Sequence, residues 1–472
     1  MPTENKLTGL VVVAATVFVA VETGGDVWAI AVFAACGALF VIECSLLRRT
    51  LSLNSLTLPA LFIYIYLVTT AISSIPVFAV LQHPMRRTYF LAVQSVLVTF
   101  PLGVGIANRL YKNPARIVQG YVHSDVQRTI SDFKFVPLFV VMALALGPLL
   151  VPYFVYAKHI QLIEVLKAYP TTVNRLSLRF AESDVPKVAQ YGFEIARRFV
   201  LPLCALYAYF MARLYRGKWT FVFWLTFCVT LLVSLLTLDR AEPVGFLMMM
   251  VFAYLLARKQ TVSQAFRSPK ILLLFGFTFA LAGLISVAQY QSTFSEEGVV
   301  AAIWRVLSVR IGSDPATMTW WAFRIFHSPS LFLHFKYERI FSVLPGFQYV
   351  EWNDTRYFVT PPLACVGNLW ENWGWPAVLI GPIALGFVYQ VIQLSVFVRK
   401  SVPILALQVI LLADVAWAVY GKVLSVMSVS VLLACFIVAL AFRPRRRTVA
   451  AARLQFSPRP YPGEADRSVV PS

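Results

Sequence analysis

The sequence predicts an all-α protein that crosses a membrane many times. Of its 472 residues, 59% are hydrophobic and only 13% are charged. Apolar runs of about 18 or more residues recur along the chain, and each is long enough to cross a bilayer as a helix. Because lipid offers the backbone no hydrogen-bond partners, these runs should be helical. We expect about twelve transmembrane helices and one large external loop.

The predicted spans form one transmembrane domain, residues 1–442. In the first half of the chain they cover residues 7–22, 27–46, 57–80, 88–107, 135–157 and 195–213. In the second half they cover residues 219–238, 244–257, 271–290, 376–397, 402–420 and 423–442. The remaining tail, residues 443–472, is basic, then Pro-rich and polar, and we expect it to be disordered.

The Lys and Arg residues behind the net charge of +19 largely cluster in short loops between the spans. A basic balance can indicate nucleic-acid binding, but the positive-inside rule predicts this distribution for cytoplasmic loops, so we expect no nucleic-acid partner. The rule places both termini and residues 48–56, 108–134 and 258–270 in the cytoplasm, with residues 158–194 and 291–375 outside. The basic turn His83–Arg87 breaks the rule, because the order of the spans puts it outside.

Neither a disulfide framework, a metal site nor a cofactor is expected. Five of the six cysteines lie in predicted spans, and only Cys365 falls in a predicted loop. The external loops hold no cluster of Asp, Glu and His with ligand-like spacing. Phosphate-binding P-loops, dinucleotide-binding glycine patterns and hydrolase motifs are also missing from the sequence. Any reaction or transport must therefore take its energy from the substrate or from a gradient.

Two groups of arginines are candidates for binding an anion at the outer membrane face. Arg240 lies in the turn Asp239-Arg-Ala-Glu-Pro243 between two spans, and Arg305 and Arg310 lie in the long external loop. A guanidinium is always charged and binds phosphate through two parallel hydrogen bonds. An ordinary solvated turn and a solvated amphipathic helix are the structural alternatives.

The long external loop also carries candidate acid–base and sugar-binding residues. Seven of the eleven tryptophans lie between residues 291 and 375, among them Trp320, Trp321 and Trp370. Indole rings prefer membrane interfaces, and some of these could instead stack on sugars. Glu338 could be a general base for a sugar hydroxyl or an ion-pair partner of a neighbouring arginine. Asp414 lies inside a predicted span, where a carboxylate indicates function by default, although Lys422 offers a structural partner.

The layout resembles the Wzy-type family of O-antigen and exopolysaccharide repeat-unit polymerases. The similarity lies in the hydropathy profile, in the arginine turn LTLDRAEPVGFLMMMVFAYLL, and in the run from loop into span LPGFQYVEWNDTRYFVTPPLACVGNLWENWGWPAVLIGPIALGF. The resemblance implies a GT-C-like, metal-independent glycosyltransferase in the bacterial cytoplasmic membrane, with its active site facing the periplasm. Its donor and acceptor would both be glycans on undecaprenyl diphosphate, and a chain-length regulator protein is a possible partner.

The resemblance, which points to external-loop arginines for the pyrophosphate, and the residue patterns above together assign roles to residues of this chain. Glu338 and Arg240 would be catalytic, as base and as stabiliser of the leaving pyrophosphate. The pyrophosphate would be bound by Arg240, Arg305, Arg310, Arg175, Arg179 and Arg339, and the sugars by Trp320, Trp321, Tyr337, Trp370 and Glu371. Two other functions remain open. An O-antigen ligase has a similar layout, and His327 and His334 fit its expected loop histidine. A lipid-linked oligosaccharide flippase or another transporter belongs to a different class, although the chain shows no two-fold repeat.

The predicted topology can be tested with reporter fusions. A periplasm-active reporter fused at Asp354 should be active, and the same reporter fused within residues 258–270 should be silent, because the Lys/Arg asymmetry orients the spans. A fusion at Asp354 that is active only with a cytoplasmic reporter would contradict the model.

Overall fold

The computed structural model describes the helices at both ends of the chain and a central group. The described residues are 3–47, 50–51, 56–114, 117, 196–215, 217–236, 241–258, 268–269, 271–273, 276, 280, 316–317, 319–320, 323, 365–396 and 402–418. Within these residues the chain is mostly helical and contains no strand. The prediction of an all-α membrane protein is confirmed at this level, whereas the number of twelve spans stays a prediction.

The helices follow the predicted spans closely. The first group is α1 (Thr3–Glu22), α2 (Val27–Leu46), α3 (Leu58–Tyr66), the π-helical η1 (Leu67–Ile72), α4 (Ser74–Val80) and α5 (Arg86–Arg109). The second group is the π-helical η3 (Ala196–Val200), α11 (Leu201–Tyr215), α12 (Lys218–Leu236) and α13 (Ala241–Arg258), and the chain continues with α18 (Cys365–Trp373), α19 (Trp375–Ser395) and α20 (Val402–Ala418). The predicted bounds agree with these helices to within about one turn.

Among the described residues, five helical segments are long and apolar enough to cross a membrane. They are Val27–Leu46, Leu58–Val80, Arg86–Arg109, Lys218–Leu235 and Trp375–Ser395, and Glu242–Ala257 and Val402–Ala416 are shorter apolar helices. The predicted spans 135–157 and 423–442 lie outside the described residues, and 271–290 is described at isolated positions.

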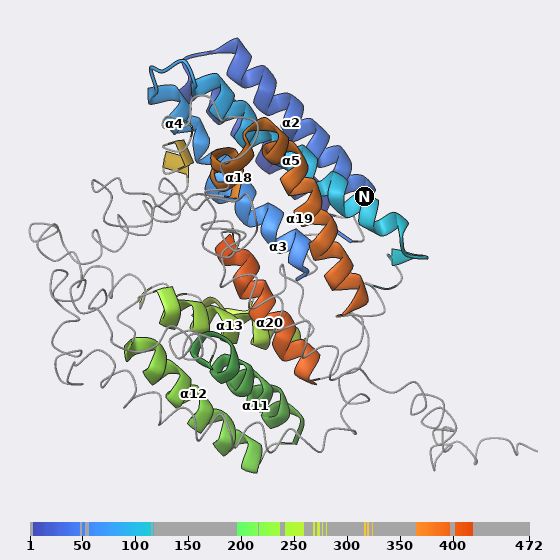
Figure 1. The fold of residues 1–472 in the computed structure, drawn as a ribbon, viewed down its shortest axis with the longest axis vertical. Coiled ribbons are helices and arrows are strands. Elements are labelled where there is room, and N and C mark those ends of the chain that lie inside the picture. Colours follow the sequence, from blue (N-terminus) through green and yellow to red (C-terminus); the bar gives the residue numbers. More distant parts are fainter. Residues whose placement is uncertain are drawn as a thin grey trace, which may run out of the picture.

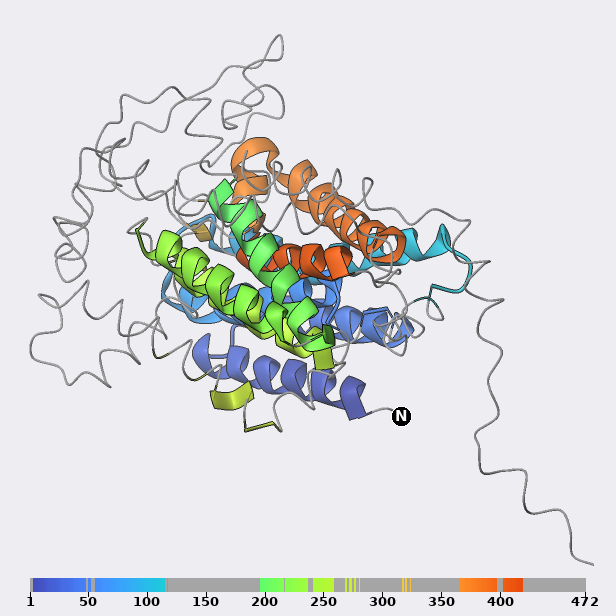
Figure 2. The same cartoon turned by 90° about the horizontal axis from the view of Figure 1, so that it is seen from below.

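The helices pack in two groups joined by α20. Helices α1 to α5 lie together with α18 and α19, whereas α11, α12 and α13 form a separate group (Figure 1). Between them lies α20, which contacts α3 on one side and α11 and α13 on the other. The first helix, α1, lies at the margin of its group with the N-terminus at its end (Figure 2). Many of its apolar side chains, such as Leu10 and Val13, are exposed, as expected of a lipid-facing helix.

Helices α5 and α19 pack closely against each other, and two glycines permit the contact. Gly103 of α5 faces the backbone carbonyl of Ile383, and Gly386 of α19 faces that of Phe100. A Cβ atom at either glycine would collide with that carbonyl oxygen, so small residues set the helix separation here. The two helices run in parallel, because Gln390, further along α19, also meets Asn108, further along α5, at 2.7 Å.

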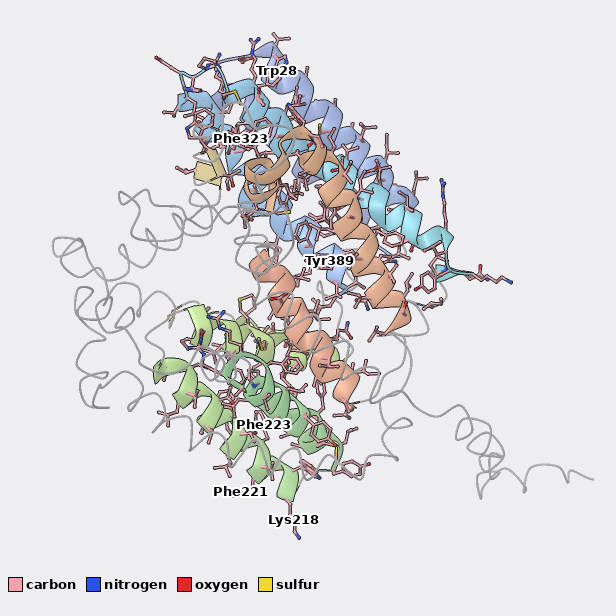
Figure 3. All side chains as sticks on the ribbon, viewed as in Figure 1. Trp28, Lys218, Phe221, Phe223, Phe323 and Tyr389 are labelled. Atoms are coloured by element: carbon pink, nitrogen blue, oxygen red, sulfur yellow. The ribbon has the colours of Figure 1, made fainter. Side chains whose placement is uncertain are left out.

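Aromatic side chains fill the space beside this pair. Phe62 of α3 stacks on Phe100 of α5 with their ring centroids 4.6 Å apart. Tyr389 of α19 packs against both rings, at 5.8 Å from Phe62 and 6.3 Å from Phe100 (Figure 3). The core of the first group is therefore built from rings on three helices.

The end of the predicted long loop is a helix packed inside the bundle. Cys365, the first residue of α18, is fully buried, so the prediction that it lies in a loop is wrong. Gly374 then turns the chain with φ 62°, a conformation that favours glycine. The turn lets α18 pack against α19, where Leu369 lies over Gly381. The sequence signal was masked by the polar residues Asn368 and Glu371.

The glycine contact predicts a difference between two substitutions on the same helix. Gly103→Ala should destabilise the protein by roughly 1–3 kcal/mol, the usual cost of overpacking. Gly105→Ala is the matched control, because the nearest atom to its added Cβ is Leu47 Cδ2 at 4.0 Å. The control should be neutral or stabilising by up to about 1 kcal/mol, since alanine favours the helix. Thermal unfolding of the purified chain in detergent measures both, and equal effects would refute the close contact.

Candidate functional site

Two arginines and a glutamate form a partly buried ion cluster where α11 and α13 begin. One Glu242 carboxylate oxygen lies 2.8 Å from an Arg197 guanidinium nitrogen and 3.1 Å from Nε of Arg198. The side chain of Arg197 is 7% exposed, that of Glu242 13% and that of Arg198 40%. The Glu242 carboxylate thus pairs with two guanidinium groups, of which that of Arg197 is buried and that of Arg198 is accessible to solvent.

The local sequence explains how these side chains meet. Arg197 and Arg198 lie in η3, the π-helical turn that leads into α11. Such turns are rare and are often found at functional sites. Glu242 lies in the first turn of α13, where a negative charge is favoured by the helix dipole. Pro243 follows it, at a position in the first turn that needs no backbone donor.

A second carboxylate approaches the same cluster from α20. The charge of Arg198 acts on Asp414, and the charge of Asp414 acts in turn on Tyr389 of α19. Ionisable groups on three helical elements, η3, α13 and α20, therefore interact electrostatically. Removing charges from water is costly unless they are paired, and ionisable groups inside a membrane usually have a function. The predicted partner of Asp414, Lys422, lies outside the described residues.

This geometry bears on the turn that contains Arg240. Residues 237–240 lie outside the described residues, but Glu242 follows Arg240 by two positions. Its carboxylate is largely buried and pairs with Arg197 and Arg198 of another helical element, while the solvated-turn alternative for Arg240 stays open.

Two of the predicted sugar-binding tryptophans lie in the described part. Trp370 of α18 is 2% exposed and stacks on Phe323 at 4.4 Å, with Trp375 against it at 5.8 Å. Trp320 is 5% exposed and packs edgewise against His83 and Tyr89. Both indoles have packing roles, and their contact with sugar stays a prediction.

The other predicted residues are not described. Glu371 belongs to α18, but its side chain lies outside the described set. Arg175, Arg179, Arg240, Arg305, Arg310, Trp321, Tyr337, Glu338 and Arg339 all lie outside the described residues. Their proposed roles as pyrophosphate ligands, sugar ligands and base therefore stay predictions.

Part of the predicted external loop is attached to α5. The hydroxyl group of Tyr89 donates a hydrogen bond to the carbonyl oxygen of Ala316 at 2.9 Å. Phe323 packs against Tyr89 as well as against Trp370, beside α18 (Figure 3). The described positions between 316 and 323 are thus held by aromatic contacts to two helices.

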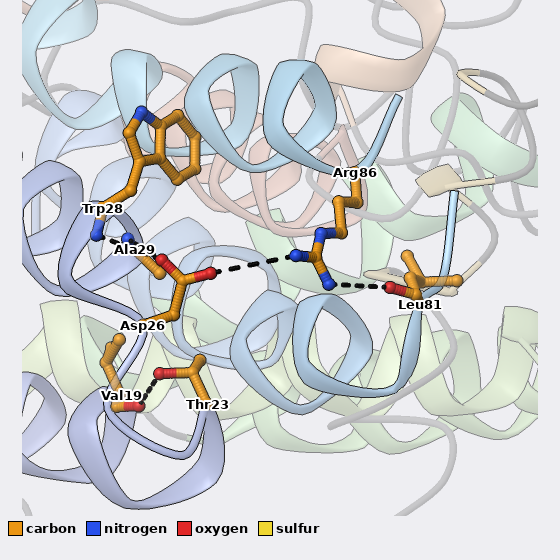
Figure 4. Close-up of polar contacts among 7 residues, drawn as sticks. All are labelled: Val19, Thr23, Asp26, Trp28, Ala29, Leu81 and Arg86. Atoms are coloured by element: carbon orange, nitrogen blue, oxygen red, sulfur yellow. Dashed lines mark hydrogen bonds and ion pairs between the residues drawn. The ribbon is translucent and has the colours of Figure 1, made fainter. Parts of the chain in front are cut away.

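The basic turn that breaks the positive-inside rule has its own contacts. Oδ1 of Asp26 caps α2 by accepting from the backbone amides of Trp28 and Ala29, while its Oδ2 lies 3.9 Å from Arg86 (Figure 4). Arg86 also donates to the Leu81 carbonyl oxygen at 3.3 Å. These contacts tie the turns α1–α2 and α4–α5 together.

The Arg197–Arg198 pair was not among the predicted site residues. Both arginines lie just inside the predicted span 195–213, and span prediction averages them with their apolar neighbours. Two adjacent charges inside such a span are the signal that could have identified them, because charges in spans are rare.

The cluster predicts a strong effect of removing its shared carboxylate. Glu242→Gln should destabilise the protein by on the order of 3–5 kcal/mol, because it leaves the buried Arg197 without its partner charge. Arg198→Gln should cost much less, about 0–1 kcal/mol, since that side chain is partly exposed. Thermal unfolding in detergent compares the two. A cost for Glu242→Gln no larger than that for Arg198→Gln would contradict the buried pairing.

Comparison with known proteins gives no family for this chain: no protein-family model, no curated protein and no solved structure matches it. The site must therefore be interpreted from its own residues.

Proposed function

We propose that this chain polymerises oligosaccharide repeat units carried on undecaprenyl diphosphate. The product would be an O-antigen or an exopolysaccharide, made at the outer face of the bacterial cytoplasmic membrane. The observation that supports this most directly is the arginine pair Arg197–Arg198, held by Glu242 two residues after Arg240. In the predicted topology, these two guanidinium groups are at the membrane face where the phosphates of a lipid lie.

The proposal rests on what guanidinium groups do at low dielectric. A planar guanidinium binds two phosphate oxygens at once and keeps its charge when buried. Fixed positive groups stabilise charge that develops in a transition state, and they act more strongly where water is excluded. Arg198 is the partly exposed member of the pair, so we assign it to the ligand and Arg197 to the protein interior.

The reaction we propose is a glycosyl transfer between two lipid-linked glycans. A hydroxyl group of the acceptor repeat unit attacks the anomeric carbon of the donor glycan. The bond from that carbon to the diphosphate oxygen breaks, and undecaprenyl diphosphate leaves with the bonding electrons. The hydroxyl proton passes to a carboxylate, for which Glu338 is our candidate. The arginines stabilise the charge on the leaving diphosphate, and no cofactor is invoked.

Glu242 would act as a positioning residue in this scheme. Its carboxylate holds both guanidinium groups in place before the lipid binds, so less ordering is needed when the substrate arrives. The arriving phosphates would compete with Glu242 for Arg198. Trp321, Tyr337 and Glu371 remain our candidates for contact with the sugars, and a chain-length regulator remains a candidate partner.

Gene deletion followed by gel analysis of the surface glycan tests the function. If the chain is a polymerase, the deletion strain should display a single repeat unit in place of a ladder. Lipid-free polymer would indicate a ligase instead, and loss of external glycan with precursor trapped inside would indicate a flippase. Either of these outcomes, or an unchanged ladder, would refute the proposal.

Complementing the deletion with Arg240 variants tests the pyrophosphate site. Arg240→Ala should reduce transition-state stabilisation by on the order of 2–4 kcal/mol, the cost of one lost preorganised donor. Arg240→Lys should recover part of the ladder, because lysine keeps the charge but loses the forked geometry. Arg109→Gln is the control. It removes an exposed arginine at the C-terminal end of α5, and this variant should polymerise normally. Normal ladders from Arg240→Ala at wild-type abundance would remove Arg240 from the site.

A further inference from the structure

The turn between α4 and α5 presents two arginines on the side of the membrane where the predicted topology allows few. Arg86 and Arg87 begin α5, and their side chains lie beside the start of α2. Basic residues at this side oppose the positive-inside rule. Their position therefore needs an explanation other than the orientation of the helix.

Arg86 is held mainly by neutral groups. Its guanidinium donates to the Leu81 carbonyl oxygen and lies 5.3 Å from the ring centre of Phe78. The nearest carboxylate, Asp26, is 3.9 Å away and already accepts two backbone hydrogen bonds through its other oxygen (Figure 4). This is a long contact for an ion pair, and 35% of the Arg86 side chain is exposed. Much of its positive charge is therefore available to a ligand.

Arg87 is exposed, and an aromatic ring fixes its position. Its guanidinium lies 5.5 Å from the ring centre of Trp28. That indole in turn packs against Phe78 at 6.1 Å and Phe90 at 6.3 Å, so three helices hold it. A cation over an aromatic face keeps its hydrogen-bond donors free at its edge. The ring of Trp28 thus fixes the position of the Arg87 guanidinium without neutralising its charge.

We propose that Arg86 and Arg87 bind the phosphate of a lipid in the outer leaflet. Two neighbouring guanidinium groups match the oxygens of one phosphate, and the half-buried Trp28 suits the interface between head groups and acyl chains. This inference does not rest on the proposed glycan chemistry. The phosphate can come from a bulk phospholipid or from a polyprenyl phosphate, which present the same group at the same depth.

The position of this lipid site connects it to the external loop. His83, in the same turn, packs edgewise against Trp320 with their ring centroids 5.3 Å apart. Trp320 belongs to the segment 316–323, which α5 also holds through Tyr89. A phosphate bound at the turn would therefore be linked to the segment 316–323 through the contact between His83 and Trp320.

The test uses the purified full-length chain in a neutral detergent. The variant is Arg86→Gln/Arg87→Gln, and the matched control is Arg109→Gln, which removes an exposed positive charge from the opposite end of the same helix. Losing outer arginines agrees with the positive-inside rule, so the double variant should insert normally. Three probes are titrated: phosphatidylglycerol, phosphatidylcholine with the same acyl chains, and a polyprenyl phosphate. Tryptophan emission and the unfolding temperature are recorded.

An anionic probe should raise the unfolding temperature of the wild type and of the control, and phosphatidylcholine should do so far less. The double variant should bind that probe at least roughly tenfold more weakly, given about fivefold per interfacial arginine. Binding of phosphatidylglycerol supports a bulk-lipid site, and binding of polyprenyl phosphate alone supports a site for carrier lipid. Equal binding by the double variant and the wild type, or no preference for anionic probes, would overturn the proposal.

Discussion

The close parallel contact between α5 and α19 is the constraint on which the described part of the fold depends. Gly103 and Gly386 let each backbone reach a carbonyl group of the other helix, and this contact sets the separation of the two axes. Phe62 and Tyr389 fill the space beside them, and α18 packs on α19. The segment 316–323 then attaches to α5 through Tyr89. Elements far apart in the sequence thus share one scaffold.

The sequence predicted the helices well and the contacts poorly, for a physical reason. Apolar length alone decides whether a segment can span lipid, so helices such as α2 and α5 could be placed from the sequence to within a turn. The pairing of Arg197 with Glu242 depends on how α11 and α13 pack, which no local pattern records. Helix α18 was missed because its polar residues resemble a loop, although its apolar face is buried.

Two arginine sites in the described part differ in how closely a carboxylate holds them. Glu242 lies within 3.1 Å of both Arg197 and Arg198, so these guanidinium groups are held in a charged contact. Asp26 is already engaged in capping α2 and leaves Arg86 at 3.9 Å. The first arrangement suits a site in which charges must be fixed at low dielectric, and the second suits a surface that binds head groups weakly and exchanges them.

The short length of α18 also has a consequence for how the protein is made. Its nine residues are too few to cross a bilayer, so the insertion machinery would not recognise it as a transmembrane segment. In the predicted topology it reaches its buried place from the outer side, and the turn at Gly374 joins it to α19. Completion of this bundle is therefore a step of tertiary folding that follows membrane insertion, and assembly can fail there even when every span has been inserted correctly.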